Sequence, residues 1–216
     1  MADNLFEARY DLTKKSKLKR FYESNKILIY VSLLLLVILF GSISYFLDSK
    51  EKKRIALSEN YVQSKIYLQN DNKEKAINLL KDIIFSNDPT YSTLSLFMIL
   101  NQNLINDNNE ISNLFDHVLS NNKYDKEIRN LLIYKKALYN SNYMNESELL
   151  GQINSLVNKD SIWTPYALLL AGDYFMSKKE YNKAKDFYIK ILSINNLEKD
   201  IYDQAKYQLK YISNVQ

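Results

Sequence analysis

The stretch from Ile27 to Leu47 reads ILIYVSLLLLVILFGSISYFL and contains no charged residue. Lys26 precedes it and Asp48 follows it. A helix rises about 1.5 Å per residue, so about 20 apolar residues cross the roughly 30 Å hydrocarbon core of a bilayer. The length and composition of this run therefore predict a transmembrane helix that begins at Ile27 and ends at Leu47.

Two other interpretations of the apolar run stay open. A core helix of a soluble domain normally has a polar stripe, whereas the polar residues here are only three serines. A signal peptide is the stronger alternative, because Ile27–Phe40 has the length of an h-region and Ser42-Ile43-Ser44 resembles a cleavage site. However, the leader carries four acidic residues and the apolar run continues past Ser44, so the sequence favours an uncleaved anchor.

Basic residues flank the run on both sides, with a small excess before it. Six precede it closely (Lys14, Lys15, Lys17, Lys19, Arg20 and Lys26) and four follow it (Lys50, Lys52, Lys53 and Arg54). The positive-inside rule then predicts a cytoplasmic segment at 1–26, a transmembrane helix at 27–47 and a translocated domain at 48–216. The basic excess before the run suits anionic lipid.

Composition excludes several function classes. The formal net charge is +4, most of it before residue 48, so the remainder has no electrostatic footprint for nucleic acid. The chain has no cysteine, which excludes disulfides, thiolate metal sites and cysteine nucleophiles. Three glycines and two prolines argue against a loop-rich β sandwich and against a glycine-rich phosphate loop.

From Ser49 onward, apolar residues recur at spacings of three and four, as in Ile111, Leu114, Phe115 and Val118. Polar clusters rich in Asn and Asp separate the periodic segments. The pattern predicts an all-α domain whose short loops make neighbouring helices antiparallel. The expected helices cover residues 50–69, 73–85, 91–105, 110–120, 125–140, 146–158, 165–178, 181–194 and 199–213.

The segment from Pro165 to Leu192 reads PYALLLAGDYFMSKKEYNKAKDFYIKIL and has the order and spacing of a tetratricopeptide (TPR) repeat. In such a repeat, small residues stand where two helices cross closely and large ones fill the gaps. Ala171, Gly172 and Ala184 are the small residues here. A glycine inside a helix costs about 1 kcal/mol relative to alanine, so close backbone approach explains Gly172.

The first hairpin repeats this arrangement more faintly, with Ala76 at the position that matches Ala184. The two alanines are 108 residues apart, close to three repeat lengths of about 34. The sequence therefore predicts one N-terminal transmembrane helix followed by a TPR-like α-solenoid of helical hairpins. The last helix would cap its open end.

No convergent set of polar residues indicates catalysis, a cofactor or a metal site. His117 is the only histidine, and without a second histidine or a cysteine it cannot form a metal site or a triad. A candidate partner-binding groove runs along the helix after Pro165, with Tyr166, Leu169, Asp173 and Met176 at helical spacing. The same stripe is equally compatible with core packing between hairpins, and Asp173 with a solvated surface.

In its layout the chain resembles one bacterial family. It has a short charged leader, the segment FYESNKILIYVSLLLLVILFG, then SYFLDSKEKKRIALSENYVQSKIYL, and TPR-like hairpins that include YALLLAGDYFMSKKEYNKAKDFYIKIL. This is similar to the single-span inner-membrane proteins that are ancillary subunits of the Sec translocon (the YfgM-type family). The resemblance implies a periplasmic solenoid beside the translocon that binds Sec subunits, periplasmic chaperones or folding factors, and emerging secretory polypeptides.

Three hypotheses of function follow. The first is a non-enzymatic, membrane-anchored protein-interaction module ancillary to the Sec translocon. The second is a TPR scaffold of the same architecture for envelope assembly or cell division. The third is an anchored enzyme, which the missing catalytic residues argue against.

Overall fold

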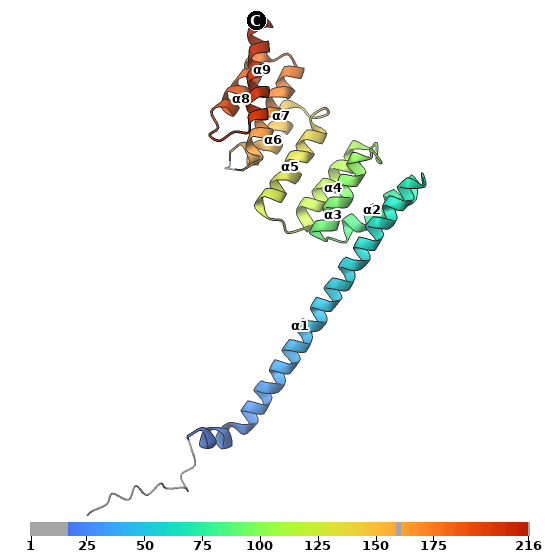
Figure 1. Ribbon diagram of the computed structural model, residues 1–216, viewed down its shortest axis with the longest axis vertical. Helices are drawn as coiled ribbons and strands as arrows, with labels where there is room; N and C mark the ends of the chain where they lie inside the picture. The colour runs from blue at the N-terminus through green and yellow to red at the C-terminus, as the bar shows by residue number, and fades with distance from the viewer. Residues whose placement is uncertain (1–16, 159–160, 216) are drawn as a thin grey trace, which may run out of the picture. The chain divides into compact units, whose positions relative to one another are not determined.

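The computed structural model describes residues 17–158 and 161–215, and its regular structure is entirely α-helical (Figure 1). An all-α fold is therefore confirmed for these residues. Residues 1–16, which form most of the predicted cytoplasmic segment, lie outside the described part. The helices are α1 (Lys17–Gln69), α2 (Lys73–Phe85), α3 (Pro89–Asn101), α4 (Asn108–Asn121), α5 (Lys126–Asn140), α6 (Glu146–Val157), α7 (Thr164–Ser177), α8 (Tyr181–Leu192) and α9 (Lys199–Val215).

The helix boundaries agree with the predicted ones to within a few residues, with two instructive differences. The expected helix at 50–69 is not separate, because α1 continues through the charged segment after the apolar run. That segment has no glycine or proline, and lysine, arginine and glutamate are good helix formers. In addition, α3 begins at Pro89 because the Asp88 side chain accepts hydrogen bonds from the first free backbone N–H groups of the helix.

The chain divides into two compact units, one before and one after the boundary between Ile55 and Ala56. In the first unit, the most apolar 18-residue stretch of α1 has a mean hydropathy of 2.7, and none of its residues is buried. Among the described residues, α1 is the one helix long and apolar enough to cross a membrane, a criterion that a signal sequence also meets. It passes through both Ile27 and Leu47, the predicted ends of the anchor.

The second unit contains two hydrophobic clusters that meet at α5. One joins α2, α3 and α4, with Leu132 of α5 completing it. The other joins α5, α6, α7, α8 and α9, and Ala137 is the contribution of α5. Leu132 and Ala137 are both fully buried, so α5 packs on both sides. The apolar run at 27–47 contributes to neither cluster.

Contacts within the second unit follow the order of the chain. Each helix from α2 onward contacts the next one, and α2 also contacts α4, α5 contacts α7, and α7 contacts α9. Helical hairpins that stack side by side give contacts of both kinds. The terminal helix α9 buries Ile201, Ala205 and Ile212, while its opposite face stays exposed.

Candidate protein-binding face

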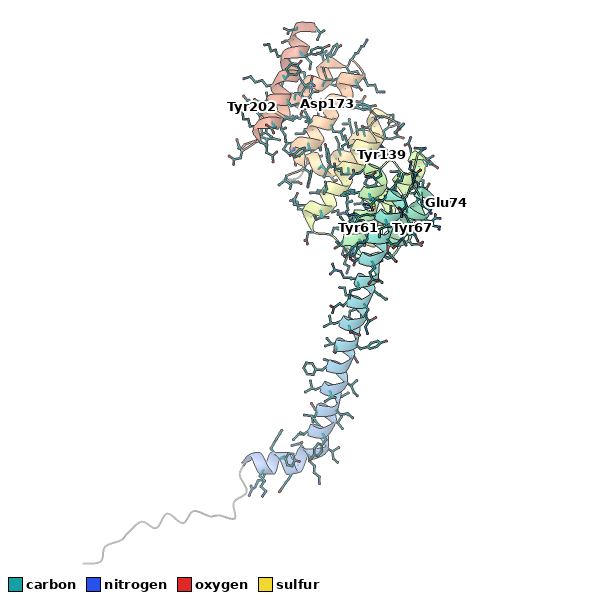
Figure 2. All side chains as sticks on the ribbon, turned by 45° about the vertical axis from the view of Figure 1, so that its right-hand side comes forward. Tyr61, Tyr67, Glu74, Tyr139, Asp173 and Tyr202 are labelled. Atoms are coloured by element: carbon teal, nitrogen blue, oxygen red, sulfur yellow. The ribbon has the colours of Figure 1, made fainter. Side chains whose placement is uncertain are left out.

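The four predicted groove residues lie on α7 and are all half-buried (Figure 2 labels Asp173). Tyr166, Leu169 and Met176 pack against the C-terminal hydrophobic cluster. These residues therefore contribute to the packing of the hairpins as well as to the surface of α7. The sequence left open whether this stripe is a surface or part of the core. The same side chains are partly exposed on α7 and partly packed in the core.

Asp173 has a specific partner inside its own hairpin. The Tyr188 hydroxyl of α8 donates a hydrogen bond of 2.7 Å to Asp173 Oδ1. Burial raises the pKa of the Asp173 carboxyl, and the hydrogen bond from Tyr188 opposes part of that rise. Burial also raises the pKa of the Tyr188 hydroxyl, and the nearby Asp173 carboxylate adds to this effect. Asp173 is thus a half-buried acceptor that links α7 to α8.

Tyr166 belongs to a cluster of three aromatic rings that connects α5 to α7. The ring centroid of Tyr134 lies 5.8 Å from that of Trp163, in a stacked arrangement, and 6.0 Å from that of Tyr166. Trp163 and Tyr166 are 5.5 Å apart, and the Tyr166 hydroxyl donates to Glu198 Oε2 at 2.9 Å. Sequence reasoning missed Tyr134, although its place one turn beyond Asn130 on an amphipathic helix gave a weak signal.

The predicted repeat-packing residues Ala76, Ala171, Gly172 and Ala184 are all buried. Gly172 has the tightest surroundings. A Cβ atom built on it would lie 2.6 Å from Cε1 and 2.8 Å from Cζ of the Tyr188 ring, closer than non-bonded carbon atoms approach. The glycine therefore lets the ring of Tyr188 lie directly on the backbone of α7, which places the phenol beside Asp173.

A pocket that the sequence did not predict lies between α3 and α5. Its volume is about 590 Å³, which falls in the range of ligand sites in proteins. Its apolar side chains include Leu94 and Ile128, which are 39% and 44% exposed. Lys123 and Asp125 add one charge of each sign. The full lining is Pro89, Thr90, Thr93, Leu94, Phe97, Lys123, Tyr124, Asp125, Ile128 and Leu131.

The pocket and the aromatic cluster share α5. Ile128, Leu131 and Tyr134 follow one another at three-residue intervals, so the helical period places them along one side of α5. We call the surface made by these residues, by Thr93, Leu94 and Phe97 of α3, and by Tyr166, Leu169, Asp173 and Met176 of α7 the odd-helix face. It offers apolar and aromatic contacts with few charges, a composition suited to polypeptide side chains.

His117 lies outside this face. Its ring nitrogens are within hydrogen-bond distance of Asn87 Oδ1, at 2.8 Å, and of Asn121 Nδ2, at 3.2 Å, and its ring packs edge-on against Phe85. Within residues 17–158 and 161–215, no group of three or more His, Asp or Glu side chains is arranged to hold a metal ion.

The apolar and aromatic side chains of the odd-helix face are consistent with binding. The resemblance in layout to the ancillary Sec subunits stays an expectation from the sequence. No protein-family model, curated protein or solved structure matches this chain.

Proposed function

We propose that this chain is a single-span protein of the bacterial inner membrane. Its N-terminus is cytoplasmic, and its periplasmic helical domain is a protein-interaction module, not an enzyme. One observation carries the proposal. No residue of the apolar run of α1 is buried, while the domain that follows builds both of its hydrophobic clusters without it. So much exposed apolar surface is unfavourable in water and favourable in lipid.

The domain is a TPR-like solenoid in this proposal. Three features support it: contacts between alternate helices, small buried residues where helices cross, and a terminal helix with an exposed outer face. Ser64, in the last part of α1, is fully buried and its hydroxyl lies 3.8 Å from the Met98 sulfur of α3. In this proposal the end of α1 is the first helix of the first hairpin.

The odd-helix face is the surface that binds partners. In stacked hairpins the first helix of each pair lines one side of the solenoid, which is where an extended or helical peptide would lie. The pocket between α3 and α5 provides a place for an apolar anchor side chain, and the rings of Tyr134 and Tyr166 extend the surface to α7.

The proposed partners are Sec translocon subunits, a periplasmic chaperone or folding factor, and emerging secretory polypeptides. This identification rests on the resemblance in layout. The second candidate, a scaffold for envelope assembly or cell division, uses the same anchor and the same face with different partners. No observation in the structure favours the second candidate over the first.

Site-specific photocrosslinking in intact cells tests both the face and the partners. A photoreactive amino acid replaces Leu94 or Ile128 at the pocket, and a matched variant carries it at Ile189, which is 49% exposed on α8. We expect adducts with a translocon subunit or a periplasmic folding factor from the two pocket positions and not from Ile189. Adducts with envelope-synthesis machinery favour the scaffold. Equal labelling from all three positions contradicts a binding role for the odd-helix face.

A further inference from the structure

The path of α1 breaks once among its described residues, just before the apolar run. Asn25 has φ −120° and ψ 16°, outside the helical region, and separates a short helical piece at 17–24 from the long apolar part (Figure 1). A sharp break in a helix needs a local cause. There is no proline or glycine near Asn25, so the cause must lie in side-chain interactions.

Two interactions hold the bend. The Asn25 side-chain amide donates to the Phe21 carbonyl at 3.0 Å, which ties the residue at the break to the preceding turn. The hydroxyls of Tyr22 and Tyr30 lie 2.6 Å apart, and their rings meet edge-on with centroids 6.4 Å apart. Tyr30 belongs to the first turn of the apolar run, so this contact joins the short piece to the start of the predicted membrane span.

The short piece is amphipathic. Phe21 and Tyr22 are 63% and 44% exposed, and the helical period places Lys19, Arg20 and Glu23 on the opposite side. Basic residues dominate the rest of the segment, with Lys17, Lys19, Arg20 and Lys26 against the single acid Glu23 between 17 and 26. Exposed aromatic rings beside basic residues are typical of helices that lie in a membrane interface.

The bend also marks a sharp change of polarity. It forms a hollow whose lining passes from Glu23, Ser24, Asn25 and Lys26 to Ile27, Leu28 and Val31. Along the normal of a bilayer, the polar headgroup region likewise gives way to the apolar hydrocarbon region. The change falls between Lys26 and Ile27, where the sequence predicts that the span begins.

We propose that residues 17–24 form an interfacial helix that lies on anionic phospholipid at the N-terminal end of the span. Phe21 and Tyr22 enter the acyl boundary, and Arg20 and Lys26 contact acidic headgroups. The occupant is anionic lipid because the segment carries a net positive charge and is continuous with the span. This inference rests on the proposed membrane anchor.

Spin labels on single cysteines test the inference in the full-length chain, which has no native cysteine. The label positions are Phe21→Cys, Glu23→Cys on the opposite side of the short helix, and Leu35→Cys within the span. The protein is reconstituted in vesicles of phosphatidylcholine with or without phosphatidylglycerol. Accessibility to oxygen, which partitions into lipid, is compared with accessibility to a water-soluble nickel complex.

We expect the label at Phe21 to lie in lipid and the label at Glu23 in water, with Phe21 immersed more strongly when phosphatidylglycerol is present. In the variant Arg20→Gln/Lys26→Gln, the ratio of lipid-immersed to water-exposed Phe21 label falls by about fivefold for each charge that is lost. The matched variant Lys50→Gln/Lys53→Gln, which removes the same charge beyond the far end of the span, leaves it unchanged.

The other outcomes separate this inference from the anchor. If the label at Leu35 is in lipid while those at Phe21 and Glu23 are both in water, the anchor stands and the interfacial helix is wrong. Equal immersion of Phe21 in both kinds of vesicle overturns the preference for anionic lipid. Dipolar broadening between Phe21 labels assigns the face to a second copy of the chain. A water-exposed label at Leu35 overturns the anchor, and the inference with it.

Discussion

Two helical segments of this protein are both rich in apolar residues but have opposite surroundings. In the run from Ile27 to Leu47 of α1, Leu33 is 60% and Leu36 is 50% exposed. In α7, Leu168 is 5% exposed and Ala171 is fully buried. The two segments each lack a polar stripe, so apolar periodicity alone does not distinguish them.

Length and side-chain size explain the difference. The 14 residues of α7 extend about 21 Å, too short for a hydrocarbon core of roughly 30 Å, whereas the run in α1 is long enough. Small residues let α8 approach α7 closely, and Tyr188 provides the partner that the one acid of α7, Asp173, requires. In α1 the bulky side chains at 33–40 leave no such site for a neighbouring helix.

The largest expected difference between the two segments comes from the same substitution in each. Leu168→Ala removes a buried side chain and should lower the free energy of unfolding of the domain by about 2–5 kcal/mol. Leu36→Ala should change it by less than about 0.5 kcal/mol, because Leu36 packs against no part of that core. Urea unfolding of the full chain in non-ionic detergent, followed by the fluorescence of the single tryptophan, measures both. Similar losses in the two variants contradict the contrast.

The glycines provide a finer comparison within the domain. Gly172→Ala pushes a Cβ atom into the Tyr188 ring, which costs about 1–3 kcal/mol, and a gain of about 1 kcal/mol in helix propensity offsets part of this. We expect a net loss of stability of up to about 2 kcal/mol. Gly151→Ala meets no atom within 4 Å and should stabilise the domain by up to about 1 kcal/mol. The same urea titration reports both signs, and a stable Gly172→Ala variant would show that the ring of Tyr188 moves aside easily.

The smallest effect concerns the buried acid of α7. Burial raises the pKa of Asp173 above its ordinary value of 3.8, so the folded state binds the proton more tightly than the unfolded chain. The contribution of Asp173 to stability is therefore complete below the unfolded pKa and is lost as the pH rises through the folded pKa. The stability of Asp173→Asn should improve relative to wild type as the pH rises from about 3 to 7.

Unfolding midpoints of the two proteins across that pH range measure this change. The matched variant Asp186→Asn, at an exposed position on α8, should show no comparable change relative to wild type. A relative stability of Asp173→Asn that falls with rising pH would mean that the hydrogen bond from Tyr188 outweighs burial.

Most of the helix boundaries could be predicted from the sequence because asparagine and aspartate mark them chemically. Asp71, Asn87 and Asn103 have positive φ just after a helix, and Asn196 has positive φ in the loop between α8 and α9, a conformation that these residues tolerate better than most. Asp107 and Asn145 cap the starts of α4 and α6 with their side chains. The sequence does not predict the continuity of α1. The polarity of the chain changes after Leu47, which suggests a boundary, but no helix-breaking residue is present there.

The candidate site was less predictable. Helical spacing placed Tyr166, Leu169, Asp173 and Met176 on α7, but it could not show that the hydroxyl of Tyr188 bonds to Asp173. Nor could it bring Tyr134 to Tyr166, 32 residues further along the chain, or form the pocket between α3 and α5. These contacts depend on how neighbouring hairpins stack, and periodicity within one helix carries no information about that.

The intact mass of the protein in membranes washed with alkaline carbonate tests most directly whether α1 carries a permanent anchor. A retained anchor predicts that the protein stays in the membrane pellet with a mass that includes residues 27–47. Recovery in the soluble fraction, with a mass that shows cleavage near Ser42–Ser44, would contradict it and assign the apolar run to a signal peptide.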